Sequence, residues 1–312
     1  MTAATEPASP ALAVLPAGGY DFAADAVVAG GGRVVEAGEA DALVWTAVTD
    51  SDGLQRTLDD HPRLRWVQLP FAGVEPYAAV IQAHADRTWT CAKGAYADPV
   101  AEHALALALT GLRQIDRYAR KQRWSRAGGR NLYGAKVTIL GGGGIATSLL
   151  RLLAPFGCEV TVVRPTPGDM PGVARVLPPA ATDEALTGAE VVVLALALVP
   201  ATVGVIDARR LALMPEGAVL VNVARGGHVV TDDLVEALRS GHLGSAGLDV
   251  TDPEPLPDGH VLWTLPNAIV TPHTANTVQM LLPLLTARIR DNVGRWAAGE
   301  PLIGLVDPVA GY

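Results

Sequence analysis

A chain of 312 residues exceeds the roughly 250–300 residues that a single hydrophobic core usually serves, so two domains are expected. Because 49% of the residues are hydrophobic and 18% are charged, the composition excludes a disordered, collagen-like or low-complexity chain. The formal net charge is −8, with 21 Arg, 3 Lys and no basic block, which argues against nucleic acid or an anionic membrane surface as a partner. A small anionic ligand bound by a few arginines remains open.

The first hundred residues alternate apolar, strand-like runs with stretches of helical spacing. Strands are expected at Ala11–Pro16, Asp41–Val48, Leu64–Phe71 and Thr88–Ala92, and helices at Asp52–Asp60 and Val74–Ala85. Strands that alternate with helices form a mainly parallel sheet covered on both faces. This part of the chain therefore predicts an α/β domain.

A long helix is expected next, from about Asp98 to Trp124. Its first half, Ala101–Leu112, is nearly all apolar and should be buried on most sides. Its second half, Arg113–Arg123, is strongly basic and should reach the surface or a partner subunit.

A second series of strands and helices follows. Strands are expected at Val137–Leu140, Glu159–Val163, Glu190–Ala195, Ala218–Asn222 and Ala268–Thr271, and helices at Ile145–Phe156, Asp207–Leu213 and Thr231–Ser240. The last helix, Val278–Ala298, comes after this series is complete. We therefore expect an α/β fold with two doubly wound parallel sheets, and we expect the last helix to return to the first domain.

A glycine-rich turn directly follows the strand Val137–Leu140 and opens a helix. The turn reads Gly141-Gly142-Gly143-Gly144-Ile145-Ala146, a G-x-G-x-x-A pattern in the strand–turn–helix context of dinucleotide-binding sites. Gly141 permits the tight turn, Gly143 lets a pyrophosphate approach the backbone, and Ala146 lets helix and strand pack closely. The alternative is a flexible glycine loop, which the flanking strand and helix disfavour.

The residue after the next strand bears on the choice of cofactor. A Rossmann site normally has an acid there, which accepts a hydrogen bond from the adenosine ribose. Here Glu159–Val163 is followed by Arg164, and no carboxylate occurs before Asp169. A guanidinium pairs well with a 2′-phosphate, so we expect NADP(H) to be preferred, with NAD(H) possible. The alternative is that Arg164 simply points into solvent.

Three later polar residues follow strand-like segments. Arg225 comes just after Ala218–Asn222, Glu254 lies between two prolines after Gly247-Leu248-Asp249-Val250, and His273 ends Val270-Thr271-Pro272-His273. Ligands of open α/β sheets bind beyond the carboxyl ends of the strands, so these side chains can converge there. Each residue alone is more typical of a surface or structural position. Their order after a dinucleotide motif indicates an active site.

Together these segments resemble the D-isomer-specific 2-hydroxyacid dehydrogenase family along nearly the whole chain. The matching segments are Ala72-Gly73-Val74, Val100-Ala101-Glu102-His103, Gly141–Ala146, Pro200-Ala201-Thr202, Asn222–Gly226, Asp249-Val250, Glu254-Pro255 and Pro272-His273. By this resemblance Arg225 binds the substrate, and His273 is the acid/base that Glu254 supports. The resemblance also implies that the backbone amides of Ala72 and Gly73 receive the substrate carboxylate.

The resemblance implies cofactor contacts and an architecture as well. The implied cofactor-binding residues are Gly141, Gly143, Gly144, Ile145, Arg164, Thr202, Ala224, Asp249 (near the nicotinamide carboxamide) and His273. A Rossmann dinucleotide-binding domain, residues 99–274, is then inserted in a flavodoxin-like substrate domain, residues 1–98 and 275–312. A homodimer is implied too, with the helix that ends near Trp124 in its interface.

The sequence departs from the family pattern at a few positions. Gly144 stands where a polar or basic residue is frequent, so one phosphate contact can be lost. Ala197 replaces a frequent proline, and Thr251 replaces a frequent aromatic residue. None of these changes touches the three residues with catalytic roles.

The leading hypothesis is an oxidoreductase that transfers hydride between NADP(H) and a small 2-oxo or 2-hydroxy acid of the glyoxylate or hydroxypyruvate type. His273 protonates the new alkoxide near neutral pH, and Arg225 holds the carboxylate and polarises the carbonyl. One alternative is an NAD-linked phosphoglycerate- or phosphite-type dehydrogenase, although Leu69–Gly73 has no cation to meet a phosphate. The other is a non-enzymatic dinucleotide sensor, like the family's co-repressor members.

The remaining features indicate a cytoplasmic protein without a structural metal. Cys91 and Cys158 show neither a disulfide framework nor metal-ligand spacing. Met1–Ala11 has no basic region ahead of an apolar run, so it does not indicate a signal peptide. The longest apolar stretch, Val191–Ile206, contains Pro200 and is shorter than the roughly 20 residues of a membrane span.

Overall fold

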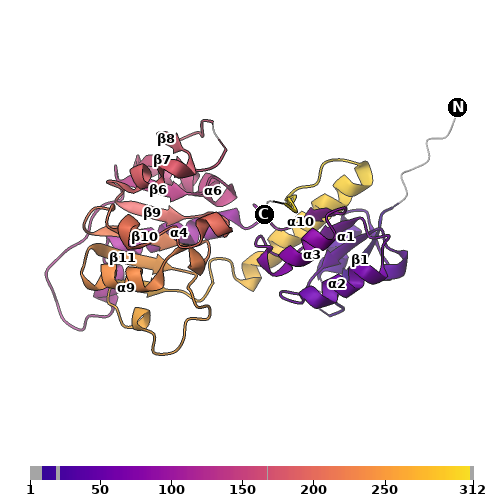
Figure 1. Ribbon diagram of the computed structural model, residues 1–312, viewed down its shortest axis with the longest axis horizontal. Coiled ribbons are helices and arrows are strands. Elements are labelled where there is room, and N and C mark those ends of the chain that lie inside the picture. Colours follow the sequence, from indigo (N-terminus) through magenta and orange to yellow (C-terminus); the bar gives the residue numbers. More distant parts are fainter. Residues whose placement is uncertain (1–8, 19–21, 167, 310–312) are drawn as a thin grey trace. The chain divides into compact units, whose positions relative to one another are not determined.

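The computed structural model describes residues 9–18, 22–166 and 168–309 (Figure 1). Residues 1–8, part of the segment examined for a signal peptide, lie outside this description. The chain divides into two compact units, one formed by Met1–Tyr96 with Thr277–Tyr312 and the other by Ala97–Asn276. Each unit contains one parallel β-sheet with its own hydrophobic core.

The first unit has a five-stranded sheet in the order β2-β1-β3-β4-β5, with parallel neighbours throughout. Its strands are β1 (Ala11–Leu15), β2 (Arg33–Val34), β3 (Ala42–Trp45), β4 (Trp66–Gln68) and β5 (Thr88–Thr90), and its helices are α1 (Phe22–Ala29), α2 (Ser51–Asp60), α3 (Ala78–Ala83) and α10 (Val278–Ala298). The strand order 2-1-3-4-5 is that of flavodoxin-like sheets.

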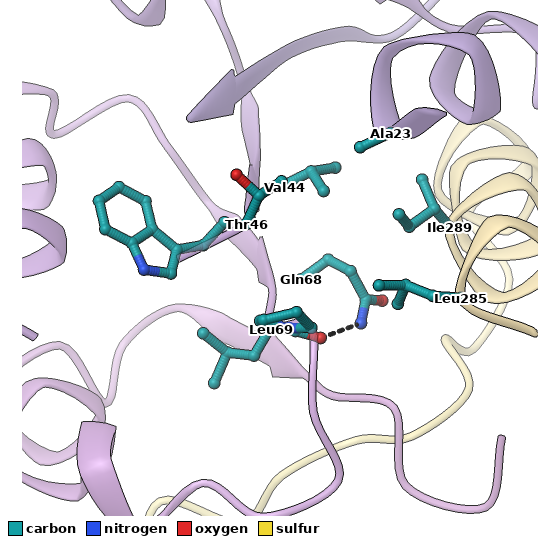
Figure 2. Close-up of a pocket in the computed structure, with 9 residues that line it drawn as sticks. Ala23, Val44, Thr46, Gln68, Leu69, Leu285 and Ile289 are labelled. Carbon is teal, nitrogen blue, oxygen red and sulfur yellow. Dashed lines mark hydrogen bonds between the residues drawn. The ribbon is translucent and has the colours of Figure 1, made fainter. Parts of the chain in front are cut away.

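The last helix completes the first unit. α10 packs against α1, and the two elements meet where Gly30 approaches Val293 so closely that a Cβ atom on Gly30 would lie 2.7 Å from the Cβ of Val293. Figure 2 shows Leu285 and Ile289 of α10 facing the buried Gln68 of β4. The side-chain amide of Asn292 donates to Oε1 of Gln68 over 2.9 Å, so a buried hydrogen bond holds α10 on the sheet.

The second unit has a seven-stranded parallel sheet in the order β12-β11-β10-β9-β6-β7-β8. Its strands are β6 (Lys136–Leu140), β7 (Glu159–Val163), β8 (Arg175–Leu177), β9 (Val191–Leu194), β10 (Ala218–Asn222), β11 (Leu243–Leu248) and β12 (Ala268–Val270). Its helices are α4 (Ala97–Leu112), α5 (Ile115–Ala119), α6 (Gly144–Leu153), α7 (Thr182–Leu186), α8 (Ala208–Leu211) and α9 (Thr231–Arg239). Read from β8, six strands follow the Rossmann order 3-2-1-4-5-6 and β12 extends the sheet.

Short 3₁₀ helices occupy several of the connections. They are η1 (Ala37–Glu39), η2 (Glu75–Tyr77), η3 (Ala154–Phe156), η4 (Pro179–Ala181), η5 (Pro200–Thr202), η6 (Gly226–His228) and η7 (Val261–Trp263). Among the helices of the described ranges, none combines the length and the apolar character that crossing a membrane requires. The expected fold class, two α/β domains with parallel sheets, is confirmed.

The expected single helix from Asp98 to Trp124 is wrong. α4 ends at Leu112, Gln114 adopts a left-handed conformation (φ 55°), and the short α5 follows. The reason is tertiary: the backbone N–H of Arg130 donates to the carbonyl of Leu112 over 2.7 Å and so caps the end of α4. Beyond the break, the guanidinium of Arg120 donates to the carbonyl oxygens of Leu265 and Ala268.

Some short elements were not expected from the sequence: α1, β2, α7, β8 and, apart from its end at Gly247-Leu248, β11. β11 is the most informative of these, because its sequence Leu-Gly-Ser-Ala-Gly-Leu has little strand propensity. The small residues are required by packing, since a Cβ atom on Gly247 would lie 2.7 Å from the Cβ of Leu107 in α4. A buried strand can therefore lack branched residues where a helix packs closely on it.

Candidate active site

The glycine turn between β6 and α6 has the geometry of an anion site. Gly141 has φ +112°, and a Cβ atom there would lie 2.1 Å from the carbonyl oxygen of Ala195, so only glycine fits. A Cβ atom on Gly143 would meet no protein atom within 4 Å. The fold itself does not require glycine at position 143, whereas a ligand lying against the backbone would.

The helix behind the turn is open at its N-terminus. Gly143 is the N-cap of α6 and provides no side-chain cap, while Gly144 is exposed and Ile145 half-buried. The first N–H groups of the helix can therefore bind an anion. Ala146 is completely buried, as close packing of α6 on the sheet requires.

Arg164 lies beside the glycine turn. Its side chain passes over Gly142, where a Cβ atom would lie 2.5 Å from the Cδ of Arg164. Nη2 of the guanidinium donates to the carbonyl of Gly168 over 2.9 Å, and the buried Nε has no hydrogen-bond partner among the described residues. The chain thus places a cation at the end of β7, beside the glycine turn, which fits the phosphate of a dinucleotide.

Arg225 is presented by a turn that Asn222 organises at the end of β10. The side-chain amide of Asn222 donates to the carbonyl of Arg225 over 2.8 Å, and its Oδ1 accepts from the N–H of Ala224 at 3.1 Å. The guanidinium of the half-buried Arg225 donates to the carbonyl of Ala224, itself a buried residue. The next residue must be glycine, because a Cβ atom on Gly226 would lie 1.9 Å from the carbonyl oxygen of Thr251.

The contact between His273 and Glu254 determines which nitrogen of the histidine ring carries the proton. Nδ1 of His273 lies 2.7 Å from Oε1 of Glu254, and the side chains are 53% and 41% exposed. An ionised carboxylate only accepts hydrogen bonds, so Nδ1 carries the proton of the neutral ring. Nε2 is then the nitrogen that can take up a proton or, in the imidazolium form, donate one.

Asp249 has a different environment from the one that the sequence suggested. Its side chain is buried, and its two oxygens accept from the N–H groups of Thr274 (2.8 Å) and Ala275 (3.0 Å) and from the hydroxyl of Thr271 (2.6 Å). The carboxylate therefore holds the turn on which His273 stands. A contact between Asp249 and the cofactor stays a prediction.

Thr202 likewise serves its own turn. Its hydroxyl accepts from the N–H of Val199 over 2.9 Å and lies within hydrogen-bond distance of the carbonyls of Ala197 and Val199. His228, to which the sequence pattern assigns no role, is a fully buried ring whose Nδ1 lies 3.0 Å from the carbonyl of Thr202. Its Nε2 lies 3.2 Å from the carbonyl of Leu196, so His228 ties the turn after β9 to the turn that carries Arg225. A histidine among apolar residues two positions after Arg-Gly is the signal that could have identified it.

Ala72 and Gly73 lie in the first unit, in the loop after β4. The thiol of Cys91 donates to the carbonyl of Ala72 over 3.6 Å, and the N–H of Ala92 donates to Phe71 over 3.0 Å. These bonds fix the loop on the neighbouring strand. The proposed substrate contacts of Ala72 and Gly73 stay a prediction.

The second unit matches a known family. Residues 103–275 match the model of the D-isomer specific 2-hydroxyacid dehydrogenase, NAD binding domain. The chain belongs to the D-isomer specific 2-hydroxyacid dehydrogenase family. The second unit of this dehydrogenase is therefore its NAD(P)-binding domain, and the glycine turn, the open helix end and Arg164 fit that cofactor class. In the described part of the chain, no group of three or more His, Cys, Asp or Glu side chains is arranged to hold a metal ion.

Named relatives and solved structures resemble the dehydrogenase over most of its length. It is 32% identical over 220 residues to a glyoxylate/hydroxypyruvate reductase A of Serratia proteamaculans, a match that covers 69% of each chain. The crystal structure of a D-isomer specific 2-hydroxyacid dehydrogenase from Xanthobacter autotrophicus, in complex with NADPH and MES, is 31% identical and covers 98% of this chain and 100% of the other, with a TM-score of 0.83. An NADPH-dependent glyoxylate/hydroxypyruvate reductase from Sinorhizobium meliloti, in complex with NADP and sulfate, is 27% identical with a TM-score of 0.78, over 97% and 100% of the two chains.

Proposed function

We propose that this dehydrogenase reduces small 2-oxo acids of the glyoxylate or hydroxypyruvate type, with NADPH as its preferred cofactor. The observation that carries the proposal is the contact between His273 and Glu254, which holds the Nδ1 proton and leaves Nε2 of the histidine free to exchange a proton with the substrate. The second unit, with the Rossmann strand order, holds the dinucleotide in this proposal. The first unit provides the substrate-binding domain.

The residues of the chain supply the proton and the orientation. Bound NADPH supplies the hydride. The imidazolium form of His273 donates its Nε2 proton to the alkoxide oxygen as it forms, and Glu254 keeps the ring oriented through Nδ1. Arg225 offers a planar pair of N–H donors to the substrate carboxylate and fixes the reacting carbon. In the reverse direction, neutral His273 accepts the proton of the hydroxyl group.

The preference for NADPH rests on Arg164. Its guanidinium lies beside the glycine turn, and the sequence has no carboxylate before Asp169 to accept from a ribose hydroxyl. A 2′-phosphate would meet the guanidinium, whereas NADH would leave the charge without a partner. The NADPH and NADP bound to the Xanthobacter and Sinorhizobium proteins support the same cofactor.

The substrate class rests on the loop after β4 and on the relatives. Leu69–Gly73 contains neither lysine nor arginine, so this loop has no cation for a phosphate group on the substrate. Its backbone amides suit a single carboxylate, in line with the reductase activity of the Serratia and Sinorhizobium proteins. A small 2-oxo acid therefore fits better than a phosphorylated one.

The proposal extends to a cytoplasmic homodimer. Ile115 of α5 and Trp124, which follows α5 in the chain, are large exposed hydrophobic residues that a second copy would cover. Both cysteines are free thiols, which suits a reducing compartment. Light scattering should give twice the chain mass, and Trp124→Asp should shift it toward the monomer.

A panel of 2-oxo acids with both reduced cofactors tests the proposed function. Glyoxylate, hydroxypyruvate, pyruvate and a phosphorylated 2-oxo acid are each mixed with NADPH or NADH, and cofactor oxidation is followed. The proposal predicts the highest kcat/KM for NADPH with glyoxylate or hydroxypyruvate. Tight NADPH binding without oxidation by any acid would instead favour a dinucleotide sensor.

A further inference from the structure

Thr271 and the buried Asp249, which hold the turn of His273, have a further polar partner in His103. His103 stands on α4, 168 residues before Thr271, and its Nε2 lies 3.0 Å from the Thr271 hydroxyl oxygen. The same nitrogen lies 3.4 Å from Oδ1 of Asp249. The imidazole of His103 is 23% exposed and the Asp249 carboxylate 2% exposed, so the contact is largely shielded from water.

The direction of these hydrogen bonds follows from the atoms involved. Asp249 is the acceptor for Thr271, whose single hydroxyl proton points to Oδ1 over 2.6 Å. The Thr271 oxygen can then only accept from His103. Nε2 of His103 therefore carries a proton, which it directs at Thr271 and Asp249 together.

Asp249 in turn holds residues 273–275, the turn that carries the ring of His273, through hydrogen bonds to their backbone N–H groups. Its backbone carbonyl accepts from the N–H of His273 at 2.9 Å, while its carboxylate accepts from the N–H groups of Thr274 and Ala275. His273 itself has φ +52°, a left-handed conformation that residues other than glycine seldom adopt. A backbone in this conformation persists only where its surroundings hold it, and here Asp249 does so on both sides of the residue.

We propose that His103 is a positioning residue for His273: its Nε2–H orients Thr271 and Asp249, which hold the turn that carries the catalytic ring. This inference rests on the proposed function, because it assigns His103 a task in the proton transfer of His273. His103 acts on the reaction through Thr271 and Asp249, which hold the backbone of residues 273–275. It therefore affects the rate of the chemical step and leaves substrate and cofactor binding nearly unchanged.

The test compares His103→Leu, which lacks the donor, with His103→Gln, whose side-chain amide places an N–H near the Nε2 position. Displacing a catalytic group through its supporting residues costs about 10–100-fold in rate. The leucine variant should lose at least about tenfold in kcat, with the KM of the 2-oxo acid and the Kd of NADPH within about twofold, and the glutamine variant should recover most of the loss. NADPH deuterated at the transferred position should show a larger isotope effect in the leucine variant, since chemistry then limits turnover.

A matched control separates positioning from general damage. His242 also has Nε2 on an oxygen, the carbonyl of Leu211 at 3.0 Å, but it precedes β11 at the opposite end of the strand from Asp249. His242→Leu should leave kcat and the isotope effect unchanged. If His103→Leu does not fold, Thr271→Val, which has no hydroxyl, and Thr271→Ser, which keeps it, make the same comparison.

A measurement that does not depend on enzymatic turnover tests the role of His103 separately from the proposed function. Histidine-ring ¹H–¹⁵N spectra, assigned with His273→Asn, should show His273 as the Nδ1–H tautomer in the natural chain and in His103→Gln, and as an averaged ring in His103→Leu. An inactive natural chain would contradict the proposed function, while these spectra would still test the positioning. If His103→Leu keeps the kcat of the natural chain and the same His273 ring spectrum, the positioning role of His103 is wrong.

Discussion

Nδ1 of His273 and Oε1 of Glu254 are 2.7 Å apart, so the carboxylate determines which ring nitrogen of the histidine is available for proton transfer. Both side chains are about half exposed, so the contact contributes little to stability and acts mainly by orienting the ring. The pair lies beyond β11 and β12, at the carboxyl edge of the dinucleotide-binding sheet. Ligands of such sheets bind at this edge.

Replacing Glu254 should slow the reaction without weakening binding. Glu254→Gln keeps an oxygen for the Nδ1 proton but removes the negative charge beside the ring. We expect kcat to fall about 10–100-fold, with the Kd of NADPH unchanged, in steady-state and binding assays. Asp258→Asn removes a charge from the same loop and should have no effect, and an equal loss in both variants would contradict the assignment.

Replacing Arg164 should change the choice of cofactor. Arg164→Leu removes the guanidinium beside the glycine turn, so kcat/KM for NADPH should fall by about 10–100-fold while that for NADH changes little. Arg151→Leu is the control, since Arg151 of α6 pairs with Asp98. A parallel loss with both cofactors would show that Arg164 does not read the 2′-phosphate.

Substitutions at Gly143 and Gly226 should have different effects, the first on NADPH affinity and the second on the stability of the fold. Gly143→Ala adds a methyl group that meets no protein atom, so the Tm should stay constant while the Kd of NADPH rises about tenfold, which is about 1.4 kcal/mol. Gly226→Ala places its methyl group against the Thr251 carbonyl and should cost about 1–3 kcal/mol in unfolding free energy. Calorimetry and NADPH titration of both variants check the contrast; a stable Gly226→Ala chain would refute the close contact.

The stability of the second unit should depend on Asp116. Burial raises the pKa of this carboxyl above its ordinary value of 3.8, and its Oδ1 has no hydrogen-bond partner among the described residues. The folded state therefore binds the proton more tightly than the unfolded state, and stability falls as pH rises above about 3.8 through the folded-state pKa.

Asp116→Asn removes this dependence, because the amide is neutral at every pH. Its Tm at pH 7 should exceed that of the natural chain by a few degrees, and the difference should shrink toward pH 4. Asp258→Asn again serves as the control. A lower Tm at neutral pH in Asp116→Asn would show that the ionised carboxylate has a stabilising partner.

Much of the fold follows from local sequence patterns. β6, the glycine turn and α6 were predictable because a strand propensity, a turn that demands glycine and an amphipathic helix agree over a short stretch. The break after Leu112 was not, since its cause is the N–H of Arg130, which approaches from a later loop. Most of the glycine-containing strand β11 was also not predicted. Its residues are small because Leu107 of α4 packs closely against Gly247, and small residues have little strand propensity.

Some residues of the candidate site were also predictable from the sequence, and others were not. Arg225 and His273 were predictable because each follows an expected strand, and Glu254 because it follows the strand-like segment Gly247–Val250. The structure brings His273 and Glu254 together. No role was assigned to His103, although it lies in a segment that resembles the family, or to His228, since their partners are distant in the sequence or are backbone carbonyls. A pattern of residue types shows which groups can do chemistry, and only the three-dimensional contacts show which groups hold them.

The most direct test is the rate of NADPH oxidation by hydroxypyruvate or glyoxylate in the natural chain and in His273→Asn. Asparagine keeps a polar group near Nδ1 but has no Nε2 and cannot carry the proton. We expect turnover by the natural chain and a loss of at least about 100-fold in kcat for the variant, at unchanged NADPH affinity. Turnover that survives in His273→Asn would contradict the assignment of His273 as the acid/base.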